Sequence, residues 1–254
     1  MSDCIVQCKQ VTVKQQGRTI FSNLDLQIYT DKICAVIGPS GVGKTTILRL
    51  ITGQIKPSSG EVFFQNKSLA HQSLAELYER RKQIGMVFQS SALFPDLNIF
   101  DNIALPLTEH LNLTQSQLTE RVESALKAVD LGAVGDLFPW QLSGGMQKRA
   151  AIARASILMP ALMLYDEPLA GQDPITSQNL LALIEHDGRK SGHSAIIVSH
   201  ELEQVLPISD QVVMLHHDGV IFSGSVSELL ACSHPYVKSF LNNVSLNLKR
   251  SVSC

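Results

Sequence analysis

Apolar residues along this chain follow two patterns, and each pattern predicts a different kind of element. Short apolar runs bounded by turn residues predict strands at residues 33–38, 84–88, 162–165 and 194–198, and a strand pair within residues 212–224. The run ICAVIG at residues 33–38 is apolar throughout, as expected of a parallel strand covered on both faces. Residues 11–32 contain short β-rich runs broken by turn residues, which predict an antiparallel sheet ahead of that strand.

Apolar residues at helical spacing indicate helices elsewhere. Residues 44–53 predict a helix that stops at Gly53, and residues 115–132 predict one that stops at Gly132. The helical character from Ser90 to about Met159 predicts a helical subdomain inserted in a parallel-sheet core. We expect residues 1–89 to form a β-subdomain with the first part of the core, and residues 90–159 to form the helical subdomain. Residues 160–231 are expected to complete the core, and residues 232–254 to form a C-terminal helix with a loose tail.

Composition limits the classes of protein that fit. With 254 residues, 44% of them hydrophobic and 17% charged, the chain is large enough for one α/β domain with an inserted subdomain. A formal charge of -2 gives no overall basic footprint for nucleic acid. The five cysteines have no paired spacing and predict a reducing compartment. The start lacks the pattern of a signal peptide, and the apolar stretch at residues 155–165 is shorter than the ~18 residues of a spanning helix. We therefore expect any membrane role to be peripheral.

The stretch GPSGVGKTT lies between a predicted strand and a predicted helix. Its glycines allow consecutive backbone N–H groups to curl around a phosphate, and the helix N-terminus adds partial positive charge. Lys44 is expected to reach the β- and γ-phosphates, and the Thr45 hydroxyl to ligate Mg²⁺. The alternative, a glycine-rich turn that only starts a helix, is disfavoured by the strand before it. The predicted nucleotide-binding residues are Gly38, Pro39, Ser40, Gly41, Val42, Gly43, Lys44, Thr45 and Thr46.

A second candidate for the catalytic site is the stretch LMLYDE, where a predicted buried strand ends in two carboxylates. We expect Asp166 to hold Mg²⁺ and Glu167 to polarise the attacking water as general base. Alone, the pair is equally compatible with surface carboxylates at a strand end. The phosphate-binding loop elsewhere in the chain favours the catalytic interpretation.

The stretch LSGGMQKR at residues 142–149 places a serine and two glycines at the start of a predicted helix. By itself it also fits a serine-capped helix with a flexible lead-in. It resembles the signature motif of ATP-binding-cassette (ABC) ATPases, and the order of motifs in the chain is similar to that family from end to end. The resemblance implies that Ser143, Gly144 and Gly145 bind the γ-phosphate held by a second copy, so that two ATP molecules are sandwiched between two subunits.

The same resemblance implies an α/β fold of the ABC-type P-loop NTPases, with a RecA-like parallel-sheet core, an N-terminal antiparallel β-subdomain and an inserted helical subdomain. It implies that Gln89 contacts Mg²⁺ and the attacking water, and that it moves the helical subdomain when the γ-phosphate leaves. His200 is similar to the switch histidine that keeps Glu167 and water aligned. Asp173 resembles the aspartate of a loop that crosses the dimer interface, although Asp173 followed by Pro174 also fits a helix N-cap.

One feature departs from the family. Many members stack the adenine on an aromatic residue before the glycine of the N-terminal hairpin, where this chain has Gln16. Base recognition then rests on aliphatic contact or on Arg18 stacking, which predicts loose discrimination between ATP and GTP.

Residues 88–107 and 164–176 resemble the ATPase subunits of bacterial Mla (maintenance of lipid asymmetry) phospholipid transporters. That resemblance implies two copies under a membrane permease dimer, a periplasmic MCE-domain partner, a cytosolic STAS-domain partner, phospholipid as cargo, and a place on the cytoplasmic face of the inner membrane. We expect no nucleic acid as a partner, because the sequence has neither long heptad insertions nor a dedicated nucleic-acid-binding domain. Apolar residues around 93–107 are the candidate permease-facing surface, with packing inside the helical subdomain as the alternative. Two other functions stay open, a subunit of another importer such as one for amino acids, and a DNA-associated cassette ATPase.

Overall fold

The computed structural model describes residues 3–70, 72–217 and 219–243, and the chain divides into two compact units. The first unit contains the residues up to Leu77 and those from Ser194 onward, and the second contains Tyr78–His193. The chain passes from the first unit to the second within helix α2 (Leu74–Lys82).

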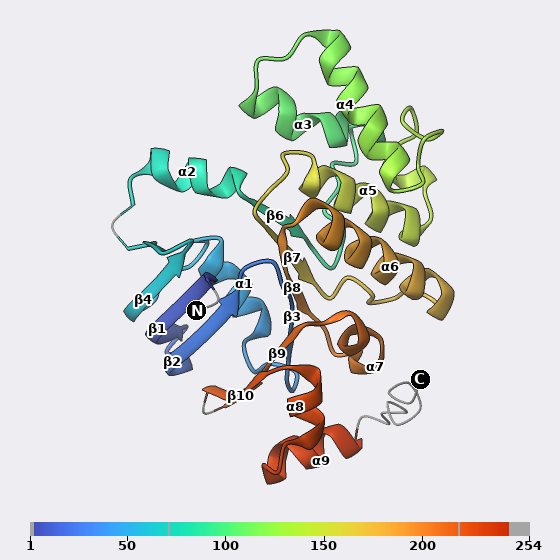
Figure 1. The fold of residues 1–254 in the computed structure, drawn as a ribbon. Coiled ribbons are helices and arrows are strands. Elements are labelled where there is room, and N and C mark those ends of the chain that lie inside the picture. The colour runs from blue at the N-terminus through green and yellow to red at the C-terminus, as the bar shows by residue number, and fades with distance from the viewer. Residues whose placement is uncertain (1–2, 71, 218, 244–254) are drawn as a thin grey trace. The chain divides into compact units, whose positions relative to one another are not determined.

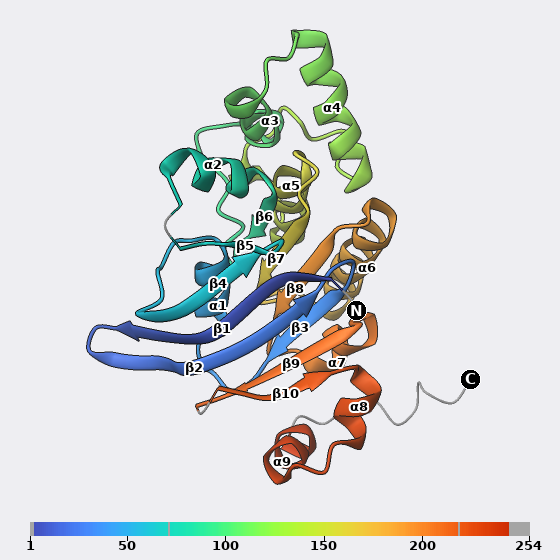
Figure 2. The ribbon, with the colours of Figure 1, turned by 60° about the vertical axis from the view of Figure 1, so that its left-hand side comes forward.

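An antiparallel sheet forms the N-terminal part of the first unit. Its strand order is β2-β1-β4-β5, with bounds β1 (Cys4–Gln15), β2 (Arg18–Tyr29), β4 (Ser59–Phe64) and β5 (Lys67–Ser68). Figure 2 shows β1 and β2 as a long hairpin. Its two turn residues, Gln16 and Gly17, have φ of 49° and 77°, which is the positive-φ pair of a type I′ turn. The predicted antiparallel sheet is confirmed.

The other strands of the first unit are three parallel strands and one antiparallel strand. Strand β3 (Ile33–Ile37) pairs in parallel with β8 (Ser194–Val198) and with β9 (Gln211–His216), and β10 (Gly219–Gly224) pairs antiparallel with β9. Every residue of β3 and β8 is buried, which explains why both read as continuous apolar runs. The helical elements of this unit are α1 (Lys44–Ile51), α7 (Leu202–Val205), the 3-10 turn η2 (Leu206–Ile208), α8 (Val226–Ala231) and α9 (Pro235–Asn243).

The second unit combines two strands with helices. Strands β6 (Ile84–Val87) and β7 (Leu162–Asp166) pair in parallel. Its helical elements are α3 (Ile99–His110), α4 (Gln115–Ala128), the 3-10 turn η1 (Pro139–Gln141), α5 (Gly144–Ser156) and α6 (Pro174–Ser191), and Figure 1 labels the four α-helices. Buried side chains from α3, α4 and α5 form one hydrophobic cluster, which includes Ile103, Leu126 and Ala150. This cluster gives the helices of the second unit a core of their own.

The α/β fold predicted from the sequence is confirmed, with one helix end displaced. Helix α4 stops at Ala128 and not at Gly132, because Asp130 takes the left-handed conformation with φ of 56°. The Leu131 N–H donates to Leu126 O at 2.8 Å and the Asp130 N–H to Lys127 O at 3.1 Å. These are the two bonds of a Schellman C-cap, with aspartate in the position usually taken by glycine.

The C-terminal helix, the cysteines and the apolar stretches were also considered in the sequence. The C-terminal helix is present as α9, while the predicted tail at residues 244–254 and Asp218 of the predicted β9–β10 turn lie outside the described residues. Cys4, Cys8, Cys34 and Cys232 are free thiols. Among residues 3–70, 72–217 and 219–243, no helix has the length and apolar character needed to cross a membrane.

Candidate functional site

The glycine loop between β3 and α1 has a backbone that admits no side chain at two positions. Gly38 has φ of 144°, and a Cβ there would lie 2.6 Å from Leu215 O. Gly43 has φ of 106°, and its Cβ would lie 2.5 Å from the Phe21 ring. Both contacts are shorter than real Cβ atoms make, so glycine is required to bring the loop close to the backbone of β9 and to Phe21.

Lys44 is the first residue of α1 and is buried. Its ammonium group donates to Gly38 O at 2.9 Å and to Pro39 O at 3.1 Å, so the lysine folds back over the loop. The N-cap of α1 is Gly43, which supplies no capping side chain, and the first turn contains no acidic residue. The unpaired N–H groups at the start of a helix carry partial positive charge, and with no acidic residue nearby they favour an anion such as phosphate. The loop therefore fits the phosphates of a nucleotide.

His200 lies at the same sheet edge as the glycine loop. Strands β3 and β8 run parallel with Val36 paired to Val198, so Gly38 and His200 each follow two residues after the paired position. The carboxyl ends of parallel strands meet at one edge, where open α/β sheets bind ligands. The His200 side chain is exposed, while the neighbouring Ser199 hydroxyl is buried and accepts the Glu201 N–H at 3.0 Å. In the first unit the structure thus brings together the predicted phosphate loop, including Thr45 and Thr46, and the predicted switch histidine.

The second unit repeats this arrangement with a different set of groups. In the parallel pair of β6 and β7, Val87 lies opposite Tyr165, so Gln89 and the carboxylates that follow Tyr165 come to one sheet edge. Asp166 is buried and ends the strand. Glu167 has φ of 49°, which is a strained, left-handed conformation for a non-glycine residue. The structure therefore places three predicted catalytic or metal-binding groups together.

The predicted signature residues form the start of α5. Ser143 is the N-cap, and its Oγ accepts the Met146 N–H at 3.3 Å, so the serine-cap interpretation is confirmed. A Cβ at Gly144 would lie 3.3 Å from the Gln172 amide, and a Cβ at Gly145 would lie 2.6 Å from the Thr176 methyl. The signature glycines therefore pack against the loop and helix that carry Asp173.

Asp173 caps helix α6, which confirms the local alternative noted from the sequence. Its Oδ1 accepts the N–H groups of Ile175 and Thr176, both at 3.0 Å, and its Oδ2 accepts the Thr176 hydroxyl at 2.6 Å. These hydrogen bonds, with the Thr176 hydroxyl first, lower the pKa of Asp173. The cap leaves Asp173 ionised and held in one place on an exposed loop.

Sequence reasoning missed Lys148. This lysine lies on α5, is 3% exposed, and donates to Gln89 O at 2.6 Å and Phe88 O at 3.3 Å. Its position one helical turn before the apolar Ile152 was the available signal, since an i, i+4 pair lies on one face of a helix. A charged residue on the buried face of a helix points to a specific partner.

The apolar residues proposed as a permease-facing surface divide between core and surface. Ile99 and Leu107 are fully buried in the hydrophobic cluster of the helices, so the packing alternative holds for them. Phe94 is 50% exposed. Among the apolar side chains proposed for that surface, Phe94 has the largest exposed fraction.

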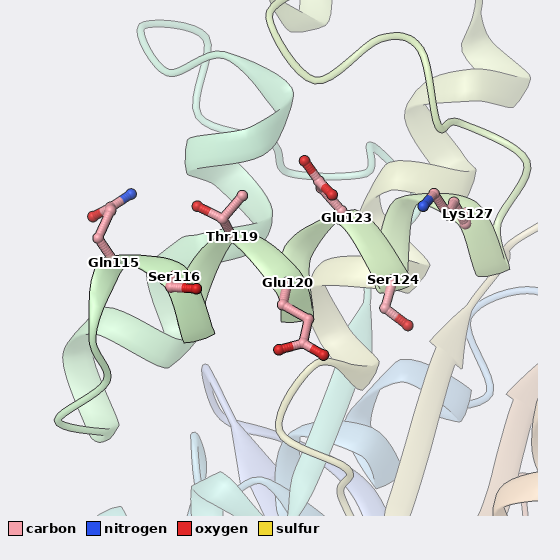
Figure 3. A pocket seen from close by; sticks show the side chains of 7 residues that line it. All are labelled: Gln115, Ser116, Thr119, Glu120, Glu123, Ser124 and Lys127. Carbon is pink, nitrogen blue, oxygen red and sulfur yellow. The ribbon is translucent and has the colours of Figure 1, made fainter.

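A polar depression of about 620 Å³ runs along α4 (Figure 3). All seven lining side chains come from this one helix, namely Gln115, Ser116, Thr119, Glu120, Glu123, Ser124 and Lys127. They include none of the residues predicted to bind nucleotide or metal. We interpret the depression as the solvated face of α4.

Comparisons with known proteins agree with this geometry. The family described as "ABC transporter" matches residues 21–170. The "Intermembrane phospholipid transport system ATP-binding protein MlaF" of Haemophilus influenzae is 42% identical, over 96% of this chain and 93% of that protein. The protein of the same name from Escherichia coli K12 is 43% identical, over 95% of this chain and 90% of that protein.

Solved structures give the same fold. The structure of cbiO1 from Clostridium perfringens, part of the ABC transporter complex cbiONQ, matches with a TM-score of 0.84 and 28% identity, over 98% of this chain and 97% of that one. A dimeric structure of the ATP-binding cassette MJ0796 in a post-hydrolysis state, bound to ADP and Pi, matches with a TM-score of 0.79 and 30% identity, over 87% of this chain and 98% of that one.

Proposed function

Because this chain belongs to the ABC transporter family and is an ATPase of that family, we propose that it is the ATP-hydrolysing subunit of a phospholipid transporter, driven by ATP-dependent dimerisation. The single observation that carries the cargo assignment is the 42–43% identity, over nearly the whole of both chains, to proteins named as the ATP-binding component of an intermembrane phospholipid transport system. The fold alone supports the ATPase and not the cargo.

Binding of the nucleotide is assigned to the first unit. The backbone N–H groups of residues 38–46 surround the phosphates, and Lys44 leaves the carbonyls of Gly38 and Pro39 to contact the β- and γ-phosphates. This exchange is favourable because a phosphate oxygen carries more negative charge than a carbonyl oxygen.

Each residue proposed for Mg²⁺ carries an oxygen donor of a kind that binds this ion, namely the Asp166 carboxylate, which is buried, the Thr45 hydroxyl and the Gln89 amide. Thr45, Gln89 and Asp166 would hold it. When bound, the ion supplies positive charge that offsets the charge on the phosphate oxygens.

Hydrolysis is assigned to three side chains of the chain itself. Glu167 accepts a proton from the attacking water, and its strained backbone fixes the carboxylate at the end of β7. By the resemblance of their motifs to those of the family, His200 and Gln89 are assigned to the orientation of the attacking water. No covalent intermediate is required, because water attacks the γ-phosphorus directly.

The signature residues act on the second copy of the chain. Ser143, Gly144 and Gly145 bind the γ-phosphate of the ATP held by the partner, with Asp173 in the loop at the same interface. Two ATP molecules then join two subunits, and hydrolysis removes the charge that both subunits bind.

For the subdivision of the chain we propose the boundaries expected from the sequence, with a helical subdomain over residues 90–159.

The proposed partners follow from the resemblance of residues 88–107 and 164–176 to the ATPase subunits of Mla transporters. Two copies of this chain would act beneath a membrane permease on the cytoplasmic face of the inner membrane, together with a STAS-domain subunit and, through the complex, an MCE-domain lipid-binding protein. Phe94, half exposed, is the side chain that we propose to contact the permease. An importer for another cargo is the second candidate, since iron(III) and methionine import subunits are 34–36% identical to this chain.

The test of the cargo assignment is purification of the tagged protein from native membranes in mild detergent. We expect a permease, an MCE-domain protein, a STAS-domain protein and bound phospholipid to co-purify, as identified by mass spectrometry. Recovery of a different permease without enriched phospholipid would retain the ATPase and contradict the cargo.

Nucleotide selectivity gives a further prediction. Gln16 is exposed in the turn between β1 and β2 and provides no aromatic face for the base. We expect the affinities for ATP and GTP to lie within about tenfold of each other, or about 1.4 kcal/mol. Replacing Gln16 by Tyr should raise the affinity for both nucleotides, because stacking tolerates any base. Competition binding measures both, and a strong ATP preference in the unaltered chain would contradict the prediction.

A further inference from the structure

Two basic side chains of helix α5 hold the segment that follows strand β6. Lys148 donates to Gln89 O at 2.6 Å and Phe88 O at 3.3 Å, and Arg154, almost two turns further along the helix, donates to Ser91 O at 3.1 Å. Three of the four carbonyls of residues 88–91 thus accept hydrogen bonds from the helix that begins at the signature motif. These bonds have a charged donor and are stronger than neutral ones.

The segment that these side chains hold is strained. Ser91 and Ala92 have φ of 63° and 48°, so two consecutive non-glycine residues occupy the left-handed region. Such residues persist only where the surrounding structure fixes them. The Ser91 N–H also donates to Phe88 O at 3.0 Å, and that oxygen is one of the two acceptors of Lys148. The Lys148 ammonium group therefore stabilises the turn from Phe88 to Ser91, whose backbone conformation is unfavourable by itself.

Helix α5 is also fixed directly to strand β6. A Cβ at Gly85 would lie 2.5 Å from Ala155 O of the helix and 2.3 Å from the Met163 sulfur, so only glycine permits this approach. Beyond the segment, Arg154 lies 3.5 Å from the Asn102 Oδ1 and 5.8 Å from the centre of the Phe94 ring. The helix thus contacts the chain before, along and after residues 88–91.

Burial of the Lys148 ammonium group removes its hydration, which has a cost in free energy. Burial lowers the pKa of Lys148, while the negative charges of Asp166 and Glu167 raise it. A methionine of similar length would avoid the loss of hydration but could not donate to the two carbonyls. The charge and the hydrogen bonds are therefore the reasons for lysine at this position.

We propose that Lys148 and Arg154 are positioning residues that clamp the segment Phe88–Ser91 to helix α5, so that a displacement of Gln89 is transmitted to Ser143 at the start of that helix. The assignment of Gln89 and Ser143 to nucleotide binding rests on the proposed function. The clamp itself rests on the hydrogen bonds and the strained backbone alone.

Hydrogen exchange of the full-length protein without nucleotide tests the clamp. In Lys148→Met we expect the amides of residues 89–92, and the Ser91 amide above all, to exchange at least about tenfold faster, because the variant loses both charge-assisted hydrogen bonds of Lys148. Lys148→Arg keeps a donor and should restore slow exchange. Arg149→Met is the matched control, since Arg149 lies on the same helix but contacts Asp130 at 3.2 Å, and it should leave these amides unchanged.

Transmission is tested by adding Mg-ATP to the Glu167→Gln variant at a protein concentration at which sedimentation gives the mass of one chain, so that no ATP of a partner contacts the signature residues. We expect residues 88–92 and residues 143–147 to gain protection together, and Lys148→Met to remove the response at 143–147 by about tenfold while residues 88–92 still respond. Lys148→Arg should recover it. A residue that only stabilised the fold would change both responses in proportion.

Unchanged exchange at Ser91 in Lys148→Met, or equal loosening in Arg149→Met, would overturn the clamp. An intact response at 143–147 in Lys148→Met would overturn the transmission. If the proposed function itself fails, the chain without the Lys148 change shows no nucleotide response at 143–147, and the exchange result without nucleotide still decides the clamp.

Discussion

Replacement of Glu167 by Gln is expected to lower ATP hydrolysis by about 10²- to 10⁴-fold, the usual contribution of a general base. Glutamine keeps the shape of the side chain and removes its ability to accept a proton. ATP binding should change little, because the phosphate loop and Lys44 belong to other segments of the chain. Phosphate release measures the first effect, and equilibrium binding of a fluorescent ATP analogue measures the second.

The control for this substitution is Glu120→Gln, which makes the same chemical change on the solvated face of α4 (Figure 3). It should hydrolyse ATP at the rate of the unaltered chain. If Glu167→Gln retained more than about a tenth of the activity, the attacking water would have another base.

Replacement of Gly145 by Ala is expected to lower hydrolysis by about 10²- to 10³-fold, the effect of losing one donor to a developing oxyanion. The new methyl group would lie 2.6 Å from the Thr176 methyl, so the start of α5 must shift from the position that presents its N–H groups. Binding of ATP to the chain's own phosphate loop should be retained. The steady-state rate and nucleotide affinity, measured together, separate the two effects.

Two further variants identify the steric contact as the cause. Thr176→Ser removes the clashing methyl and keeps the hydroxyl that donates to Asp173, so the Gly145→Ala/Thr176→Ser double variant should recover at least about tenfold, or about 1.4 kcal/mol. Gly144→Ala should be milder, because its methyl meets the flexible Gln172 side chain at 3.3 Å. A double variant as inactive as Gly145→Ala would show that the clash is not the reason.

The parts of the site that follow from short-range chemistry were predictable from the sequence. The glycine loop lies between an apolar strand and an amphipathic helix, as the sequence indicated, and the loop motif in that context predicts that Lys44 binds phosphate and Thr45 binds metal. Two carboxylates at the end of an apolar run are the same kind of signal. The N-cap role of Asp173 was also predictable beside its proposed role at the dimer interface, because the proline after it marks a helix start.

One local feature and two features that depend on tertiary contacts were not predicted. The end of α4 was expected at Gly132, but Asp130 takes the left-handed conformation because its cap completes two hydrogen bonds. Lys148 contacts carbonyls that are 59 and 60 residues away in sequence, and nothing local to the helix identifies them. The strain at Ser91 and Ala92 likewise follows from what holds the segment and not from its composition.

The central claim, that ATP joins two copies of this chain through the signature residues, is tested most directly by the mass of Glu167→Gln in solution. Sedimentation should give twice the mass of the chain with saturating Mg-ATP, the mass of one chain with Mg-ADP, and the mass of one chain with Mg-ATP when Ser143→Arg is added. A Glu167→Gln protein that remains monomeric with saturating Mg-ATP would contradict the composite site.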